Sequence, residues 1–275
     1  MSHESACNFD VRNRHAAARG DVRVLDRSFF EQGIMRLAGV DEAGRGPLAG
    51  PVCAAAVVFP PDVFIEGVND SKKLTPRQRE KLFAQITAQA LGFGIGWADP
   101  GEIDELNILR ATKLAMRRAL DQLRVQPELV LFDAVTLEDY PEPQKAFVKG
   151  DARSHAIAAA SILAKVARDR LMVRYESEFP GYGFARHKGY PTRQHVEALT
   201  ALGLTTIHRR TFTGADLFLH GMRHSRSYER WAAKILSGTD AGALSVIERE
   251  ATFLPAVEFE ELRRLAARRE LRAGL

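Results

Sequence analysis

The stretch Arg36–Phe59 reads RLAGVDEAGRGPLAGPVCAAAVVF, and it decides the fold class. Its two ends are strand-like: Arg36–Asp41 is short and β-compatible, and Pro51–Phe59 is apolar and becomes β-branched toward its end. The loop between them, Glu42–Gly50, contains three glycines and a proline, which fits a turn where the backbone approaches another group closely. We therefore predict two strands joined by a tight glycine-rich loop.

Strand and helix patterns alternate along the rest of the chain. Leu129–Phe132 is a continuous apolar run that ends at Asp133, as is typical of a buried central strand. The segment from Thr75 to Gln78 predicts a helix start, with an N-cap Thr, Pro at the first position and Gln at the third. Pro100-Gly101 is predicted to break the chain. The other predicted elements are helices over 25–33, 75–90, 108–123, 154–178 and 192–202, and strands over 91–98 and 146–148. This order predicts an α/β fold with a mixed β-sheet flanked by helices.

The composition changes twice along the chain, which suggests three parts. Residues 1–24 are polar and are predicted to be a flexible leader, and residues 25–214 carry the α/β pattern. Residues 215–275 are rich in Arg and Glu and are predicted to form a helical C-terminal extension, with a break near Ser237-Gly238-Thr239. Its role stays open among a partner-binding helix pair, a nucleic-acid clamp, a structural cap and a solvated helix surface.

The composition favours a cytoplasmic globular protein. Of the 275 residues, 45% are hydrophobic and 27% are charged, which is ordinary for such a protein. No run of 18 apolar residues exists, so we expect no membrane span, and the N-terminus has no signal-peptide pattern. The two cysteines, Cys7 and Cys53, fit free thiols in a reducing compartment, and they cannot build a thiolate zinc site.

Positive charge gathers in one segment. The net charge of the chain is +4. Residues 186–230 alone contain eight Lys or Arg against three Asp or Glu, a surplus of five, together with five of the eight histidines. Such a local surplus suggests contacts with phosphates, although a solvated charged surface fits the same pattern.

Four carboxylates stand where ligands bind in α/β sheets. Asp41-Glu42 ends one predicted strand, Asp133 ends a second, and Asp151 precedes the long helix. If they converge, they repel one another unless a cation is present, and oxygen ligands favour Mg²⁺ or Mn²⁺. Two such ions about 4 Å apart can drive in-line displacement at a phosphodiester. Taken singly, each carboxylate is more typical of a solvated turn or a helix cap, so the prediction depends on the four occurring together.

Five ordered blocks of this sequence resemble the ribonuclease HII family. They span about Leu25 to Phe212, and agreement of so many ordered blocks is specific. The blocks are Ala38–Val52 (AGVDEAGRGPLAGPV), Asn69–Leu74 (NDSKKL), Lys149–Asp151 with Ser161–Arg170, Tyr182–Thr192 (YGFARHKGYPT) and His208–Phe212 (HRRTF). The resemblance implies a ribonuclease H-like catalytic domain over residues 25–214.

The resemblance also implies an activity and a metal site. Asp41, Glu42, Asp133 and Asp151 match the four acidic positions that hold a two-metal Mg²⁺ or Mn²⁺ site in this family. The implied enzyme is a monomeric endoribonuclease that cuts 5′ of ribonucleotides in RNA/DNA hybrids or embedded in duplex DNA. It leaves a 3′-hydroxyl and a 5′-phosphate, and it serves the removal of misincorporated ribonucleotides and RNA primers.

Further positions match substrate-binding residues of the family. Gly44-Arg45-Gly46 matches the segment that reads the ribose 2′-hydroxyl, which both donates and accepts hydrogen bonds. Tyr190 matches a tyrosine that stacks on the next sugar, and a flat ring there favours deoxyribose. Lys72, Arg209 and Arg210 are the expected phosphate contacts. Arg168, on the long helix, fits a structural ion pair with Asp169 or a phosphate contact.

The chain departs from the family pattern in places, and three rival functions are considered. One of them, a recombination nuclease of the same superfamily, is disfavoured by the ordered blocks. Ala134 follows Asp133 where the family usually has Gly, so we expect the metal site to be kept and the local turn to differ, and His155 has no evident role. Ribonuclease HIII, the sister family, usually lacks the Gly-Arg-Gly form and has an N-terminal platform that residues 1–35 are too short to build. A non-catalytic hybrid-binding protein on the same fold would lack one of the four acids, and here all four are present.

Overall fold

A computed structural model describes residues 21–213, 224–237 and 254–273. They group into two compact units, and each is described by itself. The first unit comprises the chain up to Arg45 together with Val52–Ala98 and Ile108–Arg168. The second comprises Gly46–Pro51, Asp99–Asn107 and the chain from Asp169 onward. Most of the predicted leader, residues 1–20, lies outside the described residues, and the predicted division at residues 24 and 214 stays a prediction.

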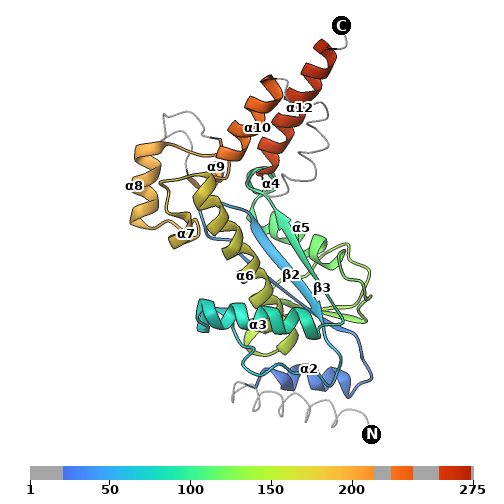
Figure 1. The fold of residues 1–275 in the computed structure, drawn as a ribbon. Coiled ribbons are helices and arrows are strands. Elements are labelled where there is room, and N and C mark those ends of the chain that lie inside the picture. Colours follow the sequence, from blue (N-terminus) through green and yellow to red (C-terminus); the bar gives the residue numbers. More distant parts are fainter. Residues whose placement is uncertain (1–20, 214–223, 238–253, 274–275) are drawn as a thin grey trace. The chain divides into compact units, whose positions relative to one another are not determined.

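A five-stranded mixed sheet forms the first unit, as predicted (Figure 1). Its strand order is β3-β2-β1-β4-β5. The strands are β1 (Leu37–Ala43), β2 (Val52–Val58), β3 (Gly92–Ala98), β4 (Leu129–Asp133) and β5 (Gln144–Phe147). β1 pairs antiparallel with β2 and parallel with β4, so the two strands that end in predicted site residues are direct neighbours. The strand predicted over 146–148 is β5, which begins two residues earlier and ends one residue earlier than predicted.

One face of the sheet is covered by α3 (Pro76–Gln89) and by the first half of α6 (His155–Glu178). Alternate residues of β2 point into this core, where Ala55 and Val57 pack against Ile86 and the alanine-rich start of α6. α3 begins with the predicted capping box, because the side chains of Thr75 and Gln78 each accept from the other's backbone N–H.

The other face is covered by α5 (Ile108–Leu120), which approaches very closely. A Cβ added at Gly94 would lie 2.1 Å from the carbonyl oxygen of Ala119, and one added at Gly96 would lie 2.0 Å from that of Ala115. The alternation of glycine with apolar residues in β3 therefore serves both faces. The glycines admit α5, and Ile95 and Trp97 pack on the core beneath α3 and α6.

α2 (Arg23–Phe30), near the start of the described chain, is held to the first turn of the long helix α6 by a side-chain hydrogen bond. It begins at Arg23, inside the stretch predicted as leader. The carboxylate of Asp26 accepts the backbone N–H of Ala156 at 2.9 Å, so it caps the first turn of α6. Asp26 is buried, and burial raises its pKa to about 7.

The second unit is helical where it is described. Pro100-Gly101 does not break the chain, contrary to prediction, but begins α4 (Pro100–Leu106). Asp99 is the N-cap of this helix and Glu102 completes a capping box, with Pro100 at a position that tolerates it. The other helices are the second half of α6, α7 (Phe184–His187), α8 (Arg193–Leu202), α9 (Arg210–Thr213), α10 (Arg226–Ser237) and α12 (Ala256–Ala273).

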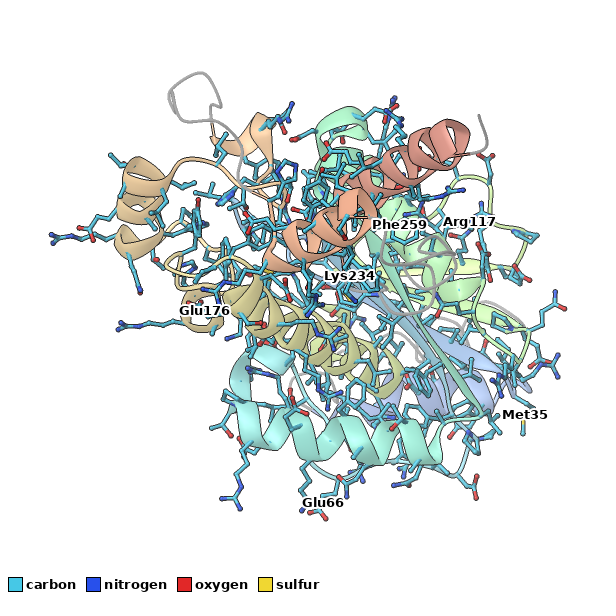
Figure 2. All side chains as sticks on the ribbon, turned by 45° about the horizontal axis from the view of Figure 1, so that its top comes forward. Met35, Glu66, Arg117, Glu176, Lys234 and Phe259 are labelled. Atoms are coloured by element: carbon cyan, nitrogen blue, oxygen red, sulfur yellow. The ribbon has the colours of Figure 1, made fainter. Side chains whose placement is uncertain are left out.

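The C-terminal region is helical, as predicted, and its two described helices pack side by side (Figures 1 and 2). Lys234 and Phe259 mark α10 and α12 in Figure 2. Trp231 and Leu262 are buried in their shared apolar cluster. The buried carboxylate of Glu258 accepts the Thr206 hydroxyl at 2.8 Å, so α12 is tied to the segment before α9. Within the described ranges, no helix combines the length and apolar character that crossing a bilayer requires.

Candidate active site

Strand pairing brings the first two carboxylates together. β1 and β4 run parallel with Val40 opposite Phe132, so the next residues, Asp41 and Asp133, stand side by side where β4 ends and two residues before the end of β1. Side chains alternate along a strand, and Gly39, two residues before Asp41, faces the start of α6. A Cβ at Gly39 would lie 2.1 Å from the backbone of Ala156. Both aspartates therefore point to the face that α6 covers.

Asp151 reaches the same place from a short 3-10 turn, η2 (Gly150–Ala152), just before α6. Lys149 adopts a left-handed conformation with φ of 55°, which turns the chain back toward β4. The backbone N–H of Gly150 then donates to Asp133 Oδ1 at 2.8 Å. A Cβ on Gly150 would meet Ile157 Cδ1 at 2.7 Å, so a glycine allows this close approach.

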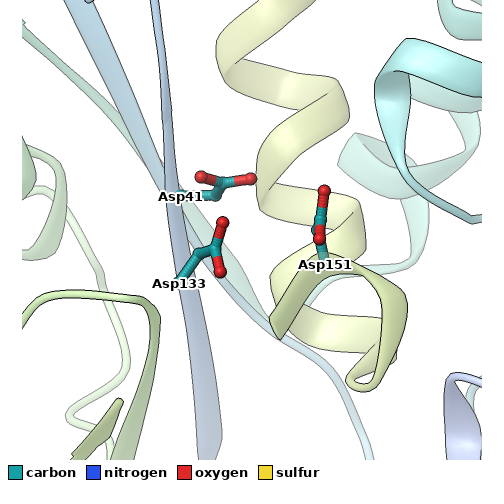
Figure 3. Close-up of side chains that lie close together, drawn as sticks. All are labelled: Asp41, Asp133 and Asp151. Carbon is teal, nitrogen blue, oxygen red and sulfur yellow. The ribbon is translucent and has the colours of Figure 1, made fainter. Parts of the chain in front are cut away.

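Asp41, Asp133 and Asp151 form one cluster (Figure 3). Each offers a carboxylate oxygen, and these oxygens all lie within 4.8 Å of one another. Burial, and then the charges of Glu42, Asp133 and Asp151, raise the pKa of Asp41 well above its usual range. Burial, Asp133 and Asp70 likewise raise the pKa of Asp151. Without a cation, the negative charges of these three carboxylates are therefore poorly stabilised.

Glu42 borders the cluster without belonging to it. It follows Asp41 in β1, and its Oε1 lies 3.3 Å from Arg45 Nη1. Burial raises the pKa of Glu42, and so does the charge of Asp133, while Arg45 and Lys72 oppose the shift. Its Oε2 is buried and has no hydrogen-bond partner. Three converging hard oxygen donors and one unsatisfied buried oxygen beside them fit a site for Mg²⁺ or Mn²⁺.

The predicted substrate residues of the first unit adjoin this cluster. The positive charge of Lys72 lowers the pKa of both Glu42 and Asp151, which places its ammonium near the carboxylates. Gly44 has φ of +95°, and a Cβ there would lie 2.0 Å from Arg168 Nε. Arg168 is buried beneath this loop, which favours a role in supporting Gly44 over a surface phosphate contact.

Asp70 belongs to the same surroundings, although the sequence analysis did not single it out. Its carboxylate accepts the backbone N–H of Lys72 at 2.9 Å and caps η1 (Ser71–Lys73). Its charge raises the pKa of Asp151. The only signal in the sequence was its place beside Ser71 in the NDSKKL block.

The remaining predicted residues lie in the second unit. The ring of Tyr190 is 41% exposed and lies 3.7 Å from the position of a Cβ on Gly46. Arg210 is exposed, and its backbone N–H donates to Asp104 Oδ2 at 2.8 Å. Arg209 has 0% exposure, and its Nε donates to the carbonyl of Gly50 at 2.9 Å. The structure thus gives Arg209 a role in holding the glycine-rich loop and offers no surface for the expected phosphate contact.

A mixed sheet whose adjacent parallel strands end in clustered aspartates, with a long helix beside them, defines a ribonuclease H-like nuclease fold. The family model of ribonuclease HII matches residues 38–215. The chain therefore belongs to the ribonuclease HII family, whose members are ribonuclease H endonucleases that remove ribonucleotides.

Individual relatives agree with this assignment. The ribonuclease HII of Moorella thermoacetica is 58% identical over 187 residues, which cover 68% of this chain and 91% of that protein. The ribonuclease HII of Syntrophotalea carbinolica is 56% identical over 195 residues, covering 71% of this chain and 93% of that one. The crystal structure of ribonuclease H2 from Pyrococcus horikoshii OT3 is similar with a TM-score of 0.57 at 34% identity, covering 67% of this chain and 97% of that chain.

Proposed function

We propose that this chain is a divalent-metal-dependent endonuclease that hydrolyses the phosphodiester on the 5′ side of a ribonucleotide and leaves a 3′-hydroxyl and a 5′-phosphate. Its substrates are RNA/DNA hybrids and duplex DNA with embedded ribonucleotides. The observation that carries this proposal is the cluster of Asp41, Asp133 and Asp151, whose carboxylate oxygens lie within 4.8 Å of one another. Membership of the ribonuclease HII family supports the same reaction.

The acids of the first unit are the proposed metal ligands. Asp41, Asp133 and Asp151 would hold the ions, and Glu42 would join them through its unpartnered Oε2. Mg²⁺ or Mn²⁺ bound as a pair would supply activation of the attacking water and neutralisation of charge on the leaving oxygen. The chain itself keeps these carboxylates in place, because the N–H of Gly150 holds Asp133 and the turn at Lys149 aims Asp151.

The substrate is proposed to be read by residues that favour a ribose followed by a deoxyribose. Gly44-Arg45-Gly46 would present backbone groups to the ribose 2′-hydroxyl, and the exposed ring of Tyr190 would stack on the next sugar. Lys72 and Arg210 would contact phosphates, since the charge of Lys72 acts on the acidic cluster and Arg210 is exposed. Arg45 would stay beside the site through its ion pair with Glu42.

The test uses a labelled DNA duplex with one embedded ribonucleotide, with the cut mapped at nucleotide resolution. We expect cleavage on the 5′ side of the ribonucleotide with Mg²⁺ or Mn²⁺ and none with EDTA. Asp151→Asn should abolish cleavage, whereas Asp62→Asn, which changes an exposed aspartate outside the cluster, should leave it intact. Binding of the duplex without any cleavage by the unaltered protein would refute the proposal and favour a hybrid-binding protein.

Two properties of the working protein complete the proposal. We infer that it acts as a monomer, as the resemblance implies, and that it resides in the cytoplasm, where the buried free thiol of Cys53 stays reduced. Light scattering of the purified chain and fractionation of the producing cells test these two inferences. A stable dimer in solution would contradict the first of them.

A further inference from the structure

Three buried histidines gather in the second unit and take no part in the proposed chemistry. His187, His195 and His208 are 8%, 0% and 3% exposed. Burial lowers the pKa of His195 to about 4 and that of His208 to about 3, and it also lowers the pKa of His187. All three rings are therefore neutral near pH 7, and each carries one N–H donor and one acceptor nitrogen.

The partners of His208 and His195 fix which nitrogen of each ring carries the proton. The backbone N–H of Thr205 donates to His208 Nδ1 at 2.8 Å, so the proton of His208 is on Nε2. That nitrogen lies 3.1 Å from His195 Nε2, which must accept. His195 then carries its proton on Nδ1, which lies 3.0 Å from the carbonyl oxygen of Tyr190. Since a carbonyl can only accept, the assignment is consistent at both ends of the chain of hydrogen bonds.

His187 supports the same turn from the other side. The backbone N–H of Gly189 donates to His187 Nδ1 at 3.2 Å, so the ring carries its proton on Nε2. His187 Nε2 donates to the carbonyl of Tyr182 at 2.7 Å. The rings of His187 and His195 stack with centroids 4.5 Å apart. The backbone on both sides of the Gly189-Tyr190 bond is thus held by an imidazole with one defined tautomer.

The turn held in this way touches the glycine-rich loop. The carbonyl of Gly189 accepts the N–H of Leu48 at 2.8 Å. Gly189 has φ of +84°, and a Cβ there would lie 2.4 Å from the carbonyl oxygen of Ala49, so a glycine is required. The ring of Tyr190 comes to rest near Gly46. A change in the turn would therefore move the tyrosine relative to the end of the loop.

We propose that His187, His195 and His208 are positioning residues that form a relay of hydrogen bonds: in this relay His208 and His195 act in series on Tyr190 while His187 acts on Gly189, and together they fix Tyr190 beside Gly46 and so set how strictly the enzyme requires a ribose–deoxyribose junction. This proposal rests on the proposed function of Tyr190. Without these hydrogen bonds, the turn would let Tyr190 sample many positions. Its ring would then accept a ribose as readily as a deoxyribose.

Nitrogen NMR of the histidine rings in the unaltered protein tests the relay directly. At pH 7 we expect three neutral rings, with the proton on Nε2 in His187 and His208 and on Nδ1 in His195. A protonated ring among the three, or a proton on Nε2 of His195, would overturn the proposal. This measurement needs neither substrate nor metal, so it is independent of the proposed activity.

Variants of His195 test the consequence for specificity. The readout is kcat/KM for a duplex with one ribonucleotide divided by kcat/KM for a uniform RNA/DNA hybrid. His195→Leu removes the ring donor to the Tyr190 carbonyl and leaves only the backbone N–H of Thr192 there, and we expect this ratio to fall about tenfold. His195→Asn places an amide N–H near the position of Nδ1 and should retain most of the ratio, whereas His195→Gln should not. Equal ratios in the Asn and Gln variants would overturn the proposal, even if the Leu variant fails to fold.

Two controls separate this proposal from the proposed function. His224→Leu removes a histidine that lies just before α10 and pairs with Glu261 of α12. This substitution should leave the ratio unchanged. If Tyr190→Ala leaves the ratio unchanged, the proposed role of the tyrosine fails, and the relay has no effect on specificity. If Tyr190→Ala lowers the ratio but His195→Leu does not, the relay alone is refuted.

Discussion

Asp133→Asn should stabilise the protein in the absence of metal and also inactivate it. The side-chain carbonyl of asparagine can still accept the N–H of Gly150, which lies 2.8 Å from Asp133 Oδ1, so the local turn is preserved. What the substitution removes is one negative charge from a group whose oxygens lie within 4.8 Å of one another. The acids compete for one small volume, and fewer charges there favour the folded state.

The magnitude follows from that spacing. Two unit charges at this separation repel by about 3.5 kcal/mol at an effective dielectric constant of about 20. Burial and the neighbouring charges raise the pKa of Asp41, which favours its neutral form and so lowers the repulsion it exerts. Asp133 is only partly buried, so water screens it further. We therefore expect a gain of about 1–2 kcal/mol in the free energy of unfolding.

Urea unfolding at pH 8, with EDTA and then with Mn²⁺, measures both effects. The unaltered protein should gain stability with Mn²⁺, because an ion that binds only the folded state stabilises it. Asp133→Asn should gain much less, so the stability order of the two proteins reverses. Asp133→Ala is the matched control, since it removes the charge and also the acceptor for Gly150. Destabilisation by Asn in EDTA, or equal stabilisation of both proteins by Mn²⁺, would refute the reasoning.

Three further substitutions test other parts of the structure. Ala134, with φ of +63°, occupies a conformation that glycine adopts without strain, so Ala134→Gly should stabilise the protein by about 0.5–1 kcal/mol in urea unfolding. Gly39→Ala should destabilise it by about 3 kcal/mol and reduce cleavage, because its Cβ would collide with α6, and unchanged stability would contradict the close packing. The buried Asp26 has its pKa raised from 3.8 to about 7, so the unaltered protein should lose stability as the pH rises through this interval. The Asp26→Asn variant has no carboxyl to titrate there and should not lose stability in this interval. Unfolding of both proteins at pH 5 and pH 8 should therefore show the variant becoming more stable relative to the unaltered protein as the pH rises.

Local patterns predicted the sheet and much of the acidic cluster. The runs that became β1 (Leu37–Ala43) and β4 (Leu129–Asp133) are strands because their apolar residues need burial, and each carries one of the carboxylates that meet at or near its end. At α4 two local signals compete: Pro100-Gly101 predicts a break, whereas the capping pair Asp99 and Glu102 around it predicts a helix start, and the structure follows the capping pair. That signal is local and was present in the sequence.

Contacts between distant residues could not be predicted in this way. Arg209 is buried because the carbonyl of Gly50, 159 residues away, accepts its guanidinium N–H. His155 is buried between Phe59 and Phe64, and its Nε2 accepts the N–H of Ile65, 90 residues away. Neither partner is marked by spacing or periodicity, so the side chains looked like surface residues or had no evident role. Tertiary packing alone decides their environment.

The pairing of β1 with β4 has a consequence for how the protein is made. A ribosome synthesises β1 and β2 early, and they can form a hairpin at once, but the parallel neighbour of β1 emerges about 90 residues later. The third aspartate follows later still, directly before the helix that packs on all of them. A nascent chain therefore holds no assembled acidic cluster until residue 151 has left the ribosome, and until then it cannot form the proposed metal site.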